Sequence, residues 1–517
     1  MSHRLRHRDR LPPAPRWLVP ASLLPVALVA LPAGYVALRS WEAGPSRIVA
    51  DLLRPYTLGL LLNTLTLSAG VCLSAVLIAT AAAWCTERCD LPGRRWWRVA
   101  MTLPMAVPSY VSSYAYSSLG PAFQGMGGAI LILTAYSTPL IYLPVSAALR
   151  GVDPSFEDVA RSLGHGRWRS FRRIVLPQAL PAIGGGALIV AAHMLSEFGA
   201  LSFLRVETFT TAIFDQYQAE FDNATAALLS GVLILLCLPV VFGEIRLRRG
   251  KRFARIAKGG ARVPAPVALG TFKLPALVGL ACYVALGFGV PMATLGFWVV
   301  RGASAGYGLG TVLPALAASI GFALPGAALT TLIAVPLVLA TTHYRGRLAA
   351  LADRLPYLVH GLPGIVVALA LVSISIRYVP ALYQSTALVL VAYAVLFLPL
   401  AQSSVRASAE LVPRELTDVA RSLGRGPFGA FVFATLPNLM PGIGAALALI
   451  ALQLMRELTA TLLLAPTGVV TLATEFWSYT SDRAYAAAAP FAATLVLISG
   501  VPVYVFTVRS LGIREWV

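Results

Sequence analysis

Apolar residues occur along this chain in long runs separated by short polar stretches. A bilayer core of about 30 Å is crossed by about 20 apolar residues in an α-helix, and many of these runs reach that length. The pattern predicts twelve transmembrane helices, six in each half of the chain. In the first half we expect them at about 17–38, 57–84, 98–118, 127–148, 182–203 and 226–245. In the second half we expect them at about 273–300, 311–341, 357–377, 385–402, 439–464 and 487–508.

The composition supports an all-α integral membrane protein. Of the 517 residues, 57% are hydrophobic and only 12% are charged, which is too little polar surface for a soluble chain of this length. Residues 17–38 follow an arginine-rich start but form too long an apolar run for a signal peptide, so we expect a membrane anchor. The five cysteines imply no disulfide framework, and we expect an unpaired structural role for Cys85 and Cys89.

The positive charge predicts the orientation in the membrane. The net charge is +19, and most of the 41 lysines and arginines fall on one side if the N-terminus is cytoplasmic and the spans alternate. Both termini are then expected in the cytoplasm. The basic charge is therefore interpreted as a signal of topology and of contact with the anionic lipid membrane, and no nucleic-acid partner is expected.

A polar heptapeptide, DVARSLG, occurs at 158–164 and again at 418–424. The similarity extends around both copies at a constant offset, so that Pro177 matches Pro437 and Glu197 matches Glu457. We therefore predict two tandem six-helix repeats. The expected domains are a basic cytoplasmic N-terminus (1–16), a first repeat (17–245) with a polar loop at 150–181, a basic linker (246–272), a second repeat (273–508) with a polar loop at 403–438, and a cytoplasmic tail (509–517).

Each heptapeptide is expected to form a short helix on the cytoplasmic surface. An aspartate near the helix start is favoured by the helix dipole, and Gly164 or Gly424 permits the chain to break at its end. Pro177 and Pro437 then mark the beginning of the next membrane helix. A single such helix could be a packed interfacial element. Two matched copies indicate instead a partner that docks on both.

The two loops resemble the EAA loop of binding-protein-dependent ABC importer permeases. In that family the pattern is E-A-A, three residues, G, nine residues and I-x-L-P. Here Asp158-Val159-Ala160 and Asp418-Val419-Ala420 stand at the first three positions, and Ala434 replaces the isoleucine in the second copy. The resemblance covers essentially the whole chain, as two fused domains similar to type I ABC importer permeases.

The resemblance implies that each loop is a coupling helix inserted into one of two copies of a cytoplasmic ABC ATPase. The residues assigned to this coupling are Asp158, Ala160, Arg161, Gly164, Pro177, Asp418, Ala420, Arg421, Gly424 and Pro437. No GxxxxGK[ST] phosphate loop is present, and none of Lys251, Lys258 and Lys273 has such a context. ATP and Mg are therefore expected on the partner ATPase, with no cofactor bound by this chain and no enzymatic activity of its own.

Ionisable groups within membrane helices are candidates for a substrate path. Glu197 and Glu457 occupy equivalent places, and each could offer a carboxylate to a cation or simply cap a helix or pair with an arginine. His193 is interpreted as a packed histidine, and Tyr110 either lines the path or is an interfacial aromatic residue. No metal site is assigned.

Three segments resemble the fused permeases of ferric-iron importers. They are LPMAVPSYVSSYAY, SEFGALSFLRVETFTTAIF and RELTATLLLAPTGVVTLATEFWSY. The resemblance implies an ATP-driven importer in the bacterial inner membrane, to which an extracytoplasmic binding protein delivers Fe(III). The same machinery could instead carry thiamine, a polyamine or an aminophosphonate. A membrane enzyme is disfavoured because the six histidines are scattered, and a passive channel would not need duplicated docking loops.

Overall fold

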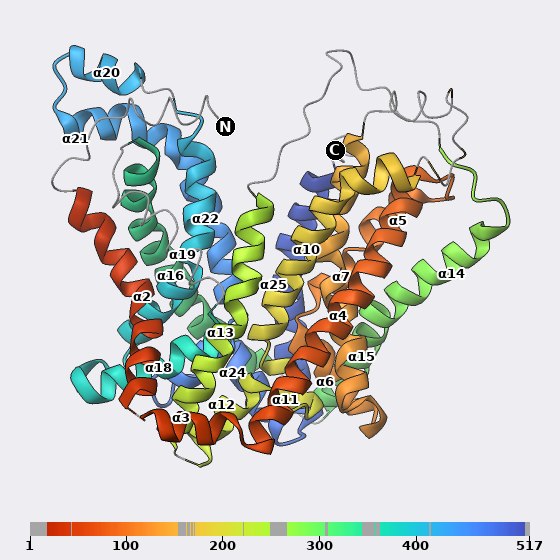
Figure 1. Cartoon of the computed structure of the whole chain (residues 1–517), viewed down its shortest axis with the longest axis horizontal. Coiled ribbons are helices and arrows are strands. Elements are labelled where there is room, and N and C mark those ends of the chain that lie inside the picture. Colours follow the sequence, from red (N-terminus) through yellow and green to blue (C-terminus); the bar gives the residue numbers. More distant parts are fainter. Residues whose placement is uncertain are drawn as a thin grey trace. The chain divides into compact units, whose positions relative to one another are not determined.

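The described part of the chain folds into helices, as a computed structural model shows (Figure 1). The structure describes residues 18–42, 44–152, 162, 166, 169, 171–220, 222–248, 266–304, 309–343, 356, 362–412 and 415–511. Within these ranges the only β-type pairing is one isolated bridge between Cys89 and Val267. The all-helical class predicted from the apolar runs is confirmed.

The first sequence half contains ten described α-helices. They are α2 (Leu18–Glu42), α3 (Pro45–Leu52), α4 (Pro55–Arg88), α5 (Arg94–Ala100), α6 (Ser109–Leu119), α7 (Met126–Gly151), α10 (Leu176–Ser196), α11 (Gly199–Leu204), α12 (Phe209–Gln218) and α13 (Asn223–Arg248).

The second sequence half contains eleven described α-helices. They are α14 (Lys273–Val284), α15 (Val290–Ser304), α16 (Leu309–His343), α18 (Gly364–Tyr378), α19 (Thr386–Ala409), α20 (Glu415–Ser422), α21 (Pro427–Ala430), α22 (Leu436–Leu454), α23 (Thr459–Leu464), α24 (Leu472–Ser481) and α25 (Tyr485–Leu511).

Nine helical stretches of the described residues are long and apolar enough to cross a membrane. Two further apolar helices, at Gly364–Tyr378 and Tyr485–Gly500, are shorter. The predicted span at 98–118 is not one continuous helix. Pro104 and Pro108 lie between α5 and α6, and proline removes a backbone donor and restricts the residue before it, so that a full helix begins only at Ser109.

The described chain packs as two compact units, and each unit takes helices from both sequence halves. The first unit comprises residues 1–52, 213–234 and 309–477, and the second comprises 53–212, 235–308 and 478–517. The predicted domain boundaries follow the sequence repeat, whereas the compact units group helices by their contacts. The two divisions describe different things, so the domain boundaries stay a prediction.

The core of the first unit is built around α16, α19 and α22. These helices pack extensively against one another, and α2 from the first sequence half packs against α16 and α18. Val26 and Val29 of α2 are buried in the same cluster as Leu398 and Ile450 of the second half. The first apolar span therefore belongs to the packing of the second half's helices.

The core of the second unit is built around α4, α7 and α10, and it receives α14 and α15 from the second sequence half. The Tyr283 hydroxyl donates to the Ala135 carbonyl at 2.9 Å, and the Tyr116 hydroxyl donates to the Leu286 carbonyl at 2.7 Å. Close approach depends on small residues: a Cβ at Gly186 of α10 would lie 2.9 Å from Ile141 Cα of α7. The first membrane span of the second half is thus held by helices of the first half.

Candidate functional site

The second polar loop forms the short helix that the heptapeptide predicts. Helix α20 runs from Glu415 to Ser422. Gly424 follows it with a φ of +83°, and the N–H of Arg425 donates to the Ala420 carbonyl at 3.2 Å. This left-handed residue ends the helix and satisfies its last carbonyls, as a glycine at that position does. The expected helix and its glycine break are confirmed in this copy.

The apolar side of α20 is largely open. Val419 is 53% exposed, and Leu423, one turn further on, is 77% exposed. Inward contacts come from Thr417, whose hydroxyl lies 3.3 Å from that of Thr435. Arg421 lies on the exposed side of the last turn. The helix is therefore fixed at one side and offers apolar side chains on the other.

The chain after α20 leads directly into a membrane helix. The short helix α21 is followed by a π-helical turn, η7 (Phe431–Thr435), and then by α22, which has Pro437 in its first turn. The Arg425 guanidinium lies 4.0 Å above the Phe433 ring, a cation–π contact that ties the loop to η7. A displacement of the loop would therefore be transmitted to the start of α22.

Most of the first polar loop lies outside the described residues, including Asp158, Ala160, Arg161 and Gly164, as does the side chain of Asp418. The described end of this loop matches the second copy. A π-helical turn, η3 (Phe171–Val175), precedes α10, which has Pro177 in its first turn. The duplicated sequence thus builds the same turn-and-proline entry to a membrane helix in both halves.

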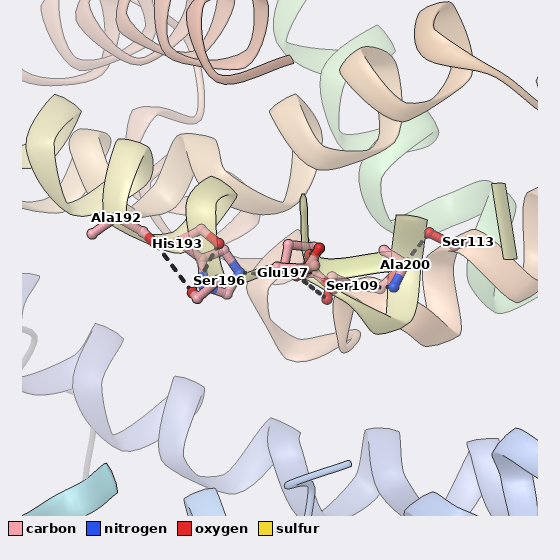
Figure 2. A network of polar contacts seen from close by, with 8 residues as sticks. Ser109, Ser113, Ala192, His193, Ser196, Glu197 and Ala200 are labelled. Atoms are coloured by element: carbon pink, nitrogen blue, oxygen red, sulfur yellow. Dashed lines mark hydrogen bonds and ion pairs between the residues drawn. The ribbon is translucent and has the colours of Figure 1, made fainter. Parts of the chain in front are cut away.

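Glu197 lies at a break in the predicted fifth span, between α10 and α11 (Figure 2). Its Oε1 accepts the N–H of Ala200 at 3.0 Å, and its Oε2 accepts the Ser109 hydroxyl at 2.9 Å. The side chain is 7% exposed. The carboxylate therefore caps the first turn of α11 and also binds the first residue of α6, where backbone N–H groups favour a negative charge.

Glu457 occupies the same place in the second half. Its Oε1 accepts the N–H of Ala460 at 3.1 Å, in the first turn of α23. The position of a Cβ on Gly364, the first residue of α18, would lie 3.6 Å from that same oxygen. From the sequence, each glutamate could contact a cation or cap a helix. The capping contact is present in both halves.

The two glutamate sites differ in their neighbours. His193 Nε2 lies 3.4 Å from Glu197 Oε2, and the imidazole stacks on the Tyr136 ring with centroids 5.3 Å apart. In the second half Gln453 stands at the histidine's position, and its Oε1 accepts from the Arg456 Nε at 2.7 Å. The interpretation of His193 as a packed histidine is incomplete, because it also faces a carboxylate.

Tyr110 is buried in α6, with 7% of its surface exposed. The two tyrosines that follow it in the same helix have structural partners. The Tyr114 hydroxyl donates to the Tyr485 carbonyl at 2.7 Å, and that of Tyr116 donates to Leu286, as described above. This helix is therefore held from several sides.

The described residues also include no group of three or more His, Cys, Asp or Glu side chains that could hold a metal ion. Within the same ranges the five cysteines are free, Cys89 and Cys237 being buried.

The family described as binding-protein-dependent transport system inner membrane component matches this sequence twice, at residues 75–247 and 332–509. The chain belongs to this family. It is a multi-pass inner-membrane permease of a binding-protein-dependent ABC importer, and it carries two copies of the family's domain. Permeases of this family have no catalytic activity of their own and work with a binding protein and an ATPase.

Similar curated proteins fall into two groups by coverage. The chain is 43% identical over 493 residues to the Fe(3+)-transport system permease protein FbpB 2 of Haemophilus influenzae, covering 95% of this chain and 97% of that protein. It is 32% identical over 178 residues to the molybdenum transport system permease protein ModB of Escherichia coli, covering 30% of this chain and 78% of that protein. It is 28% identical over 193 residues to the sulfate transport system permease protein CysT of Escherichia coli, covering 33% of this chain and 69% of that protein.

One ionic cluster of this permease was not predicted from the sequence. The Glu87 side chain, fully buried at the end of α4, lies 2.7 Å from Arg98 and 3.5 Å from Arg150. It therefore joins α4 to α5 and to the end of α7, which leads into the first polar loop. The available signal was an acid at the end of an apolar run with arginines on both following segments.

A second missed contact lies just after α4. The Lys273 ammonium is 2.7 Å from Asp90 Oδ2, and the N–H of Leu269 donates to Asp90 Oδ1 at 2.8 Å. The hydrogen bond from Lys273 holds the pKa of the Asp90 carboxyl below its ordinary value, and that from Leu269 adds to the effect. The bridge between Cys89 and Val267 completes this junction, which fixes the start of α14.

Proposed function

We propose that this permease imports ferric iron delivered by an extracytoplasmic binding protein. The observation that carries the proposal is the 43% identity to the Fe(3+)-transport permease, because it extends over nearly the whole of both chains. The molybdenum and sulfate permeases match only about a third of the sequence and so bear on a single repeat. The alternative is that the same machinery carries thiamine, a polyamine or an aminophosphonate. The test must distinguish these cargoes from ferric iron.

Each polar loop is proposed to dock into one of two copies of a cytoplasmic ABC ATPase, which binds ATP and Mg. The support is the geometry of α20, where Val419 and Leu423 are exposed while Thr417 and Arg425 tie the loop to the chain entering α22. Nucleotide-driven movement of the ATPases would pull on α20 and so on α22. Asp158, Ala160, Arg161, Gly164 and Pro177 are proposed to do the same for α10.

The proposed topology has twelve spans with both termini in the cytoplasm. Nine described stretches have the length and composition of a span, and α6, α18 and α25 would supply the remaining three. The short α6 and α18 are the third helices of their repeats. Both polar loops then lie on the cytoplasmic side, where a soluble ATPase can reach them.

Glu197, Glu457 and Tyr110 are proposed to lie beside the path of the cargo. A carboxylate oxygen has two lone pairs, so a glutamate that caps a helix can still attract a cation. The caps at Ala200 and Ala460 would hold the two carboxylates in fixed positions. Ferric iron is a hard cation that oxygen ligands suit.

Uptake in cells tests the cargo. The permease is expressed with its ATPase and binding protein in a bacterial strain that lacks its own ferric-iron and thiamine permeases. We expect accumulation of radiolabelled iron and none of radiolabelled thiamine. Accumulation of thiamine alone would assign the permease to the alternative cargo. Loss of uptake in a G424V variant, whichever cargo is carried, would indicate that the second polar loop is needed for coupling to the ATPase.

A further inference from the structure

A basic and aromatic patch lies at the end of α4 in the second unit. It consists of Arg95 and Trp96 on α5, of Phe272 immediately before α14 and of Leu274 in the first turn of α14. Trp96 is 74% exposed, and Phe272 and Leu274 are each 70% exposed. Arg95 is exposed and forms no ion pair within the described ranges.

The outward direction of Trp96 follows from how α5 is anchored. Arg98 pairs with the buried Glu87 at 2.7 Å, and Trp97 packs against the core of the second unit. These two contacts occupy one side of a helix of seven residues. Trp96 lies on the opposite side of the helix and is largely exposed, and Arg95 is exposed beside the Arg98 turn.

The segment that carries Phe272 is held at the same end of α4. Asp90 binds the N–H of Leu269 and the ammonium of Lys273, so the chain on either side of Phe272 is fixed. Along α14, Leu274 is followed one turn later by Val278, which is 52% exposed. Both lie in a stretch with the length and composition of a membrane span, Gly270–Gly302. The patch thus lies at the polar ends of two spans, α4 and the stretch Gly270–Gly302, next to an exposed apolar surface.

The charge balance of this region favours an anion. Two acids of the described residues lie at this end of α4, and both are paired, Glu87 with Arg98 and Arg150 and Asp90 with Lys273. The exposed Arg95 guanidinium has no ion pair with a described residue, and it can bind a phosphate with two parallel hydrogen bonds. An indole beside it suits the boundary between headgroups and acyl chains.

We propose that Arg95, Trp96, Phe272 and Leu274 bind an anionic phospholipid. The phosphate binds Arg95, and the acyl chains lie against Trp96, Phe272 and the exposed side of α14. This site is independent of the cargo and of the ATPase. It would fix the junction between α4, α5 and the first span of the second half.

Native mass spectrometry of the full chain in detergent, titrated with phosphatidylglycerol or with phosphatidylcholine, tests the proposal. We expect the wild type to retain phosphatidylglycerol preferentially. R95Q should weaken that binding by roughly fivefold, the contribution expected of one basic residue at an anionic membrane surface. R205Q, which removes another exposed arginine of the same unit, is the matched control and should bind as the wild type does.

A second variant separates a lipid from free phosphate. W96A removes acyl-chain contact and should also weaken phosphatidylglycerol binding, whereas inorganic phosphate should not displace the lipid. Circular dichroism confirms that each variant is folded. The proposal is overturned if the wild type retains both lipids equally, if R95Q binds as the wild type does, or if R205Q loses as much as R95Q. It is equally overturned if W96A has no effect or if inorganic phosphate displaces the lipid.

Discussion

The Ser109 hydroxyl donates a hydrogen bond of 2.9 Å to Glu197, joining the first residue of α6 to the break between α10 and α11. In the second half α18 begins with Gly364, which has no hydroxyl to donate to Glu457. Two matched carboxylates are thus held by different sets of partners. The two repeats of this permease share a framework but differ at the glutamate sites.

This difference predicts unequal effects of matched substitutions. E197A removes an acceptor from both Ala200 and Ser109 and should destabilise the permease by about 2 kcal/mol. E457A removes the Ala460 cap and should cost about 1 kcal/mol. Unfolding in detergent, followed by circular dichroism, measures both. An additional S109A substitution should change little in the E197A background, and a full further loss there would refute the shared bond.

Gly424 should be required for coupling because of its backbone and not because of space. Its φ is +83°, and no atom of the described residues beyond its chain neighbours lies within 4 Å of where a Cβ would stand. A valine in the left-handed region is strained by about 1–2 kcal/mol, which should displace the end of α20. We expect G424V to reduce retention of the partner ATPase in a pull-down by about tenfold, a loss of about 1.4 kcal/mol.

Gly426 supplies the control for that experiment. It lies two residues further on, also in open space, and its φ is not in the left-handed region. G426V should therefore retain the ATPase. If G426V and G424V reduce ATPase retention equally, the loss is caused by a larger side chain near the docking surface. The left-handed conformation of Gly424 would then not be the reason.

The buried Glu87 should be important for stability. Removing its charge leaves Arg98 and Arg150 facing each other without an acid between them. Loss of one partner of a buried ion pair costs about 3–5 kcal/mol, so E87Q should lower the unfolding temperature clearly. E207Q, at an exposed glutamate, should not. An E87Q variant as stable as the wild type would show that the cluster contributes nothing net.

Asp90 predicts a dependence of stability on pH. Its pKa is lowered in the folded protein by Lys273 and Leu269, so its contribution is present above the ordinary carboxyl pKa and is lost as the pH falls through the folded value. D90N should therefore be less stable than the wild type at neutral pH, and the difference should vanish in strong acid. Unfolding temperatures across this range measure it, with D482N as the exposed control. A difference that persists in strong acid would contradict the ionic origin.

The sequence was sufficient to predict the class, the repeat and the short helix of the second loop. Apolar runs of span length, the duplicated heptapeptide and Gly424 are local signals, and local geometry follows from them. The breaks at Glu197 and Glu457 were not predicted, although a capping role was one alternative for each glutamate, because the apolar runs continue past both residues. Both glutamates accept an N–H of the helix that follows, and Glu197 also accepts the hydroxyl of Ser109, which is far away in sequence.

The exchange of helices between the two sequence halves could not be predicted either. A span such as α2 or α14 has the same apolar pattern whichever neighbours it packs against, since lipid and helix interiors are equally apolar. Contacts such as Tyr283 with Ala135 and Lys273 with Asp90 specify the neighbour, and each joins residues from opposite halves. Only the folded structure reveals them.

The most direct test of the account is ATP-driven uptake into proteoliposomes. The permease is reconstituted with its ATPase, and the iron-loaded binding protein is placed outside. We predict ferric iron accumulation that requires ATP inside the vesicle and falls about tenfold with G424V but not with G426V. Iron accumulation without ATP, or unchanged uptake by G424V, would contradict the account.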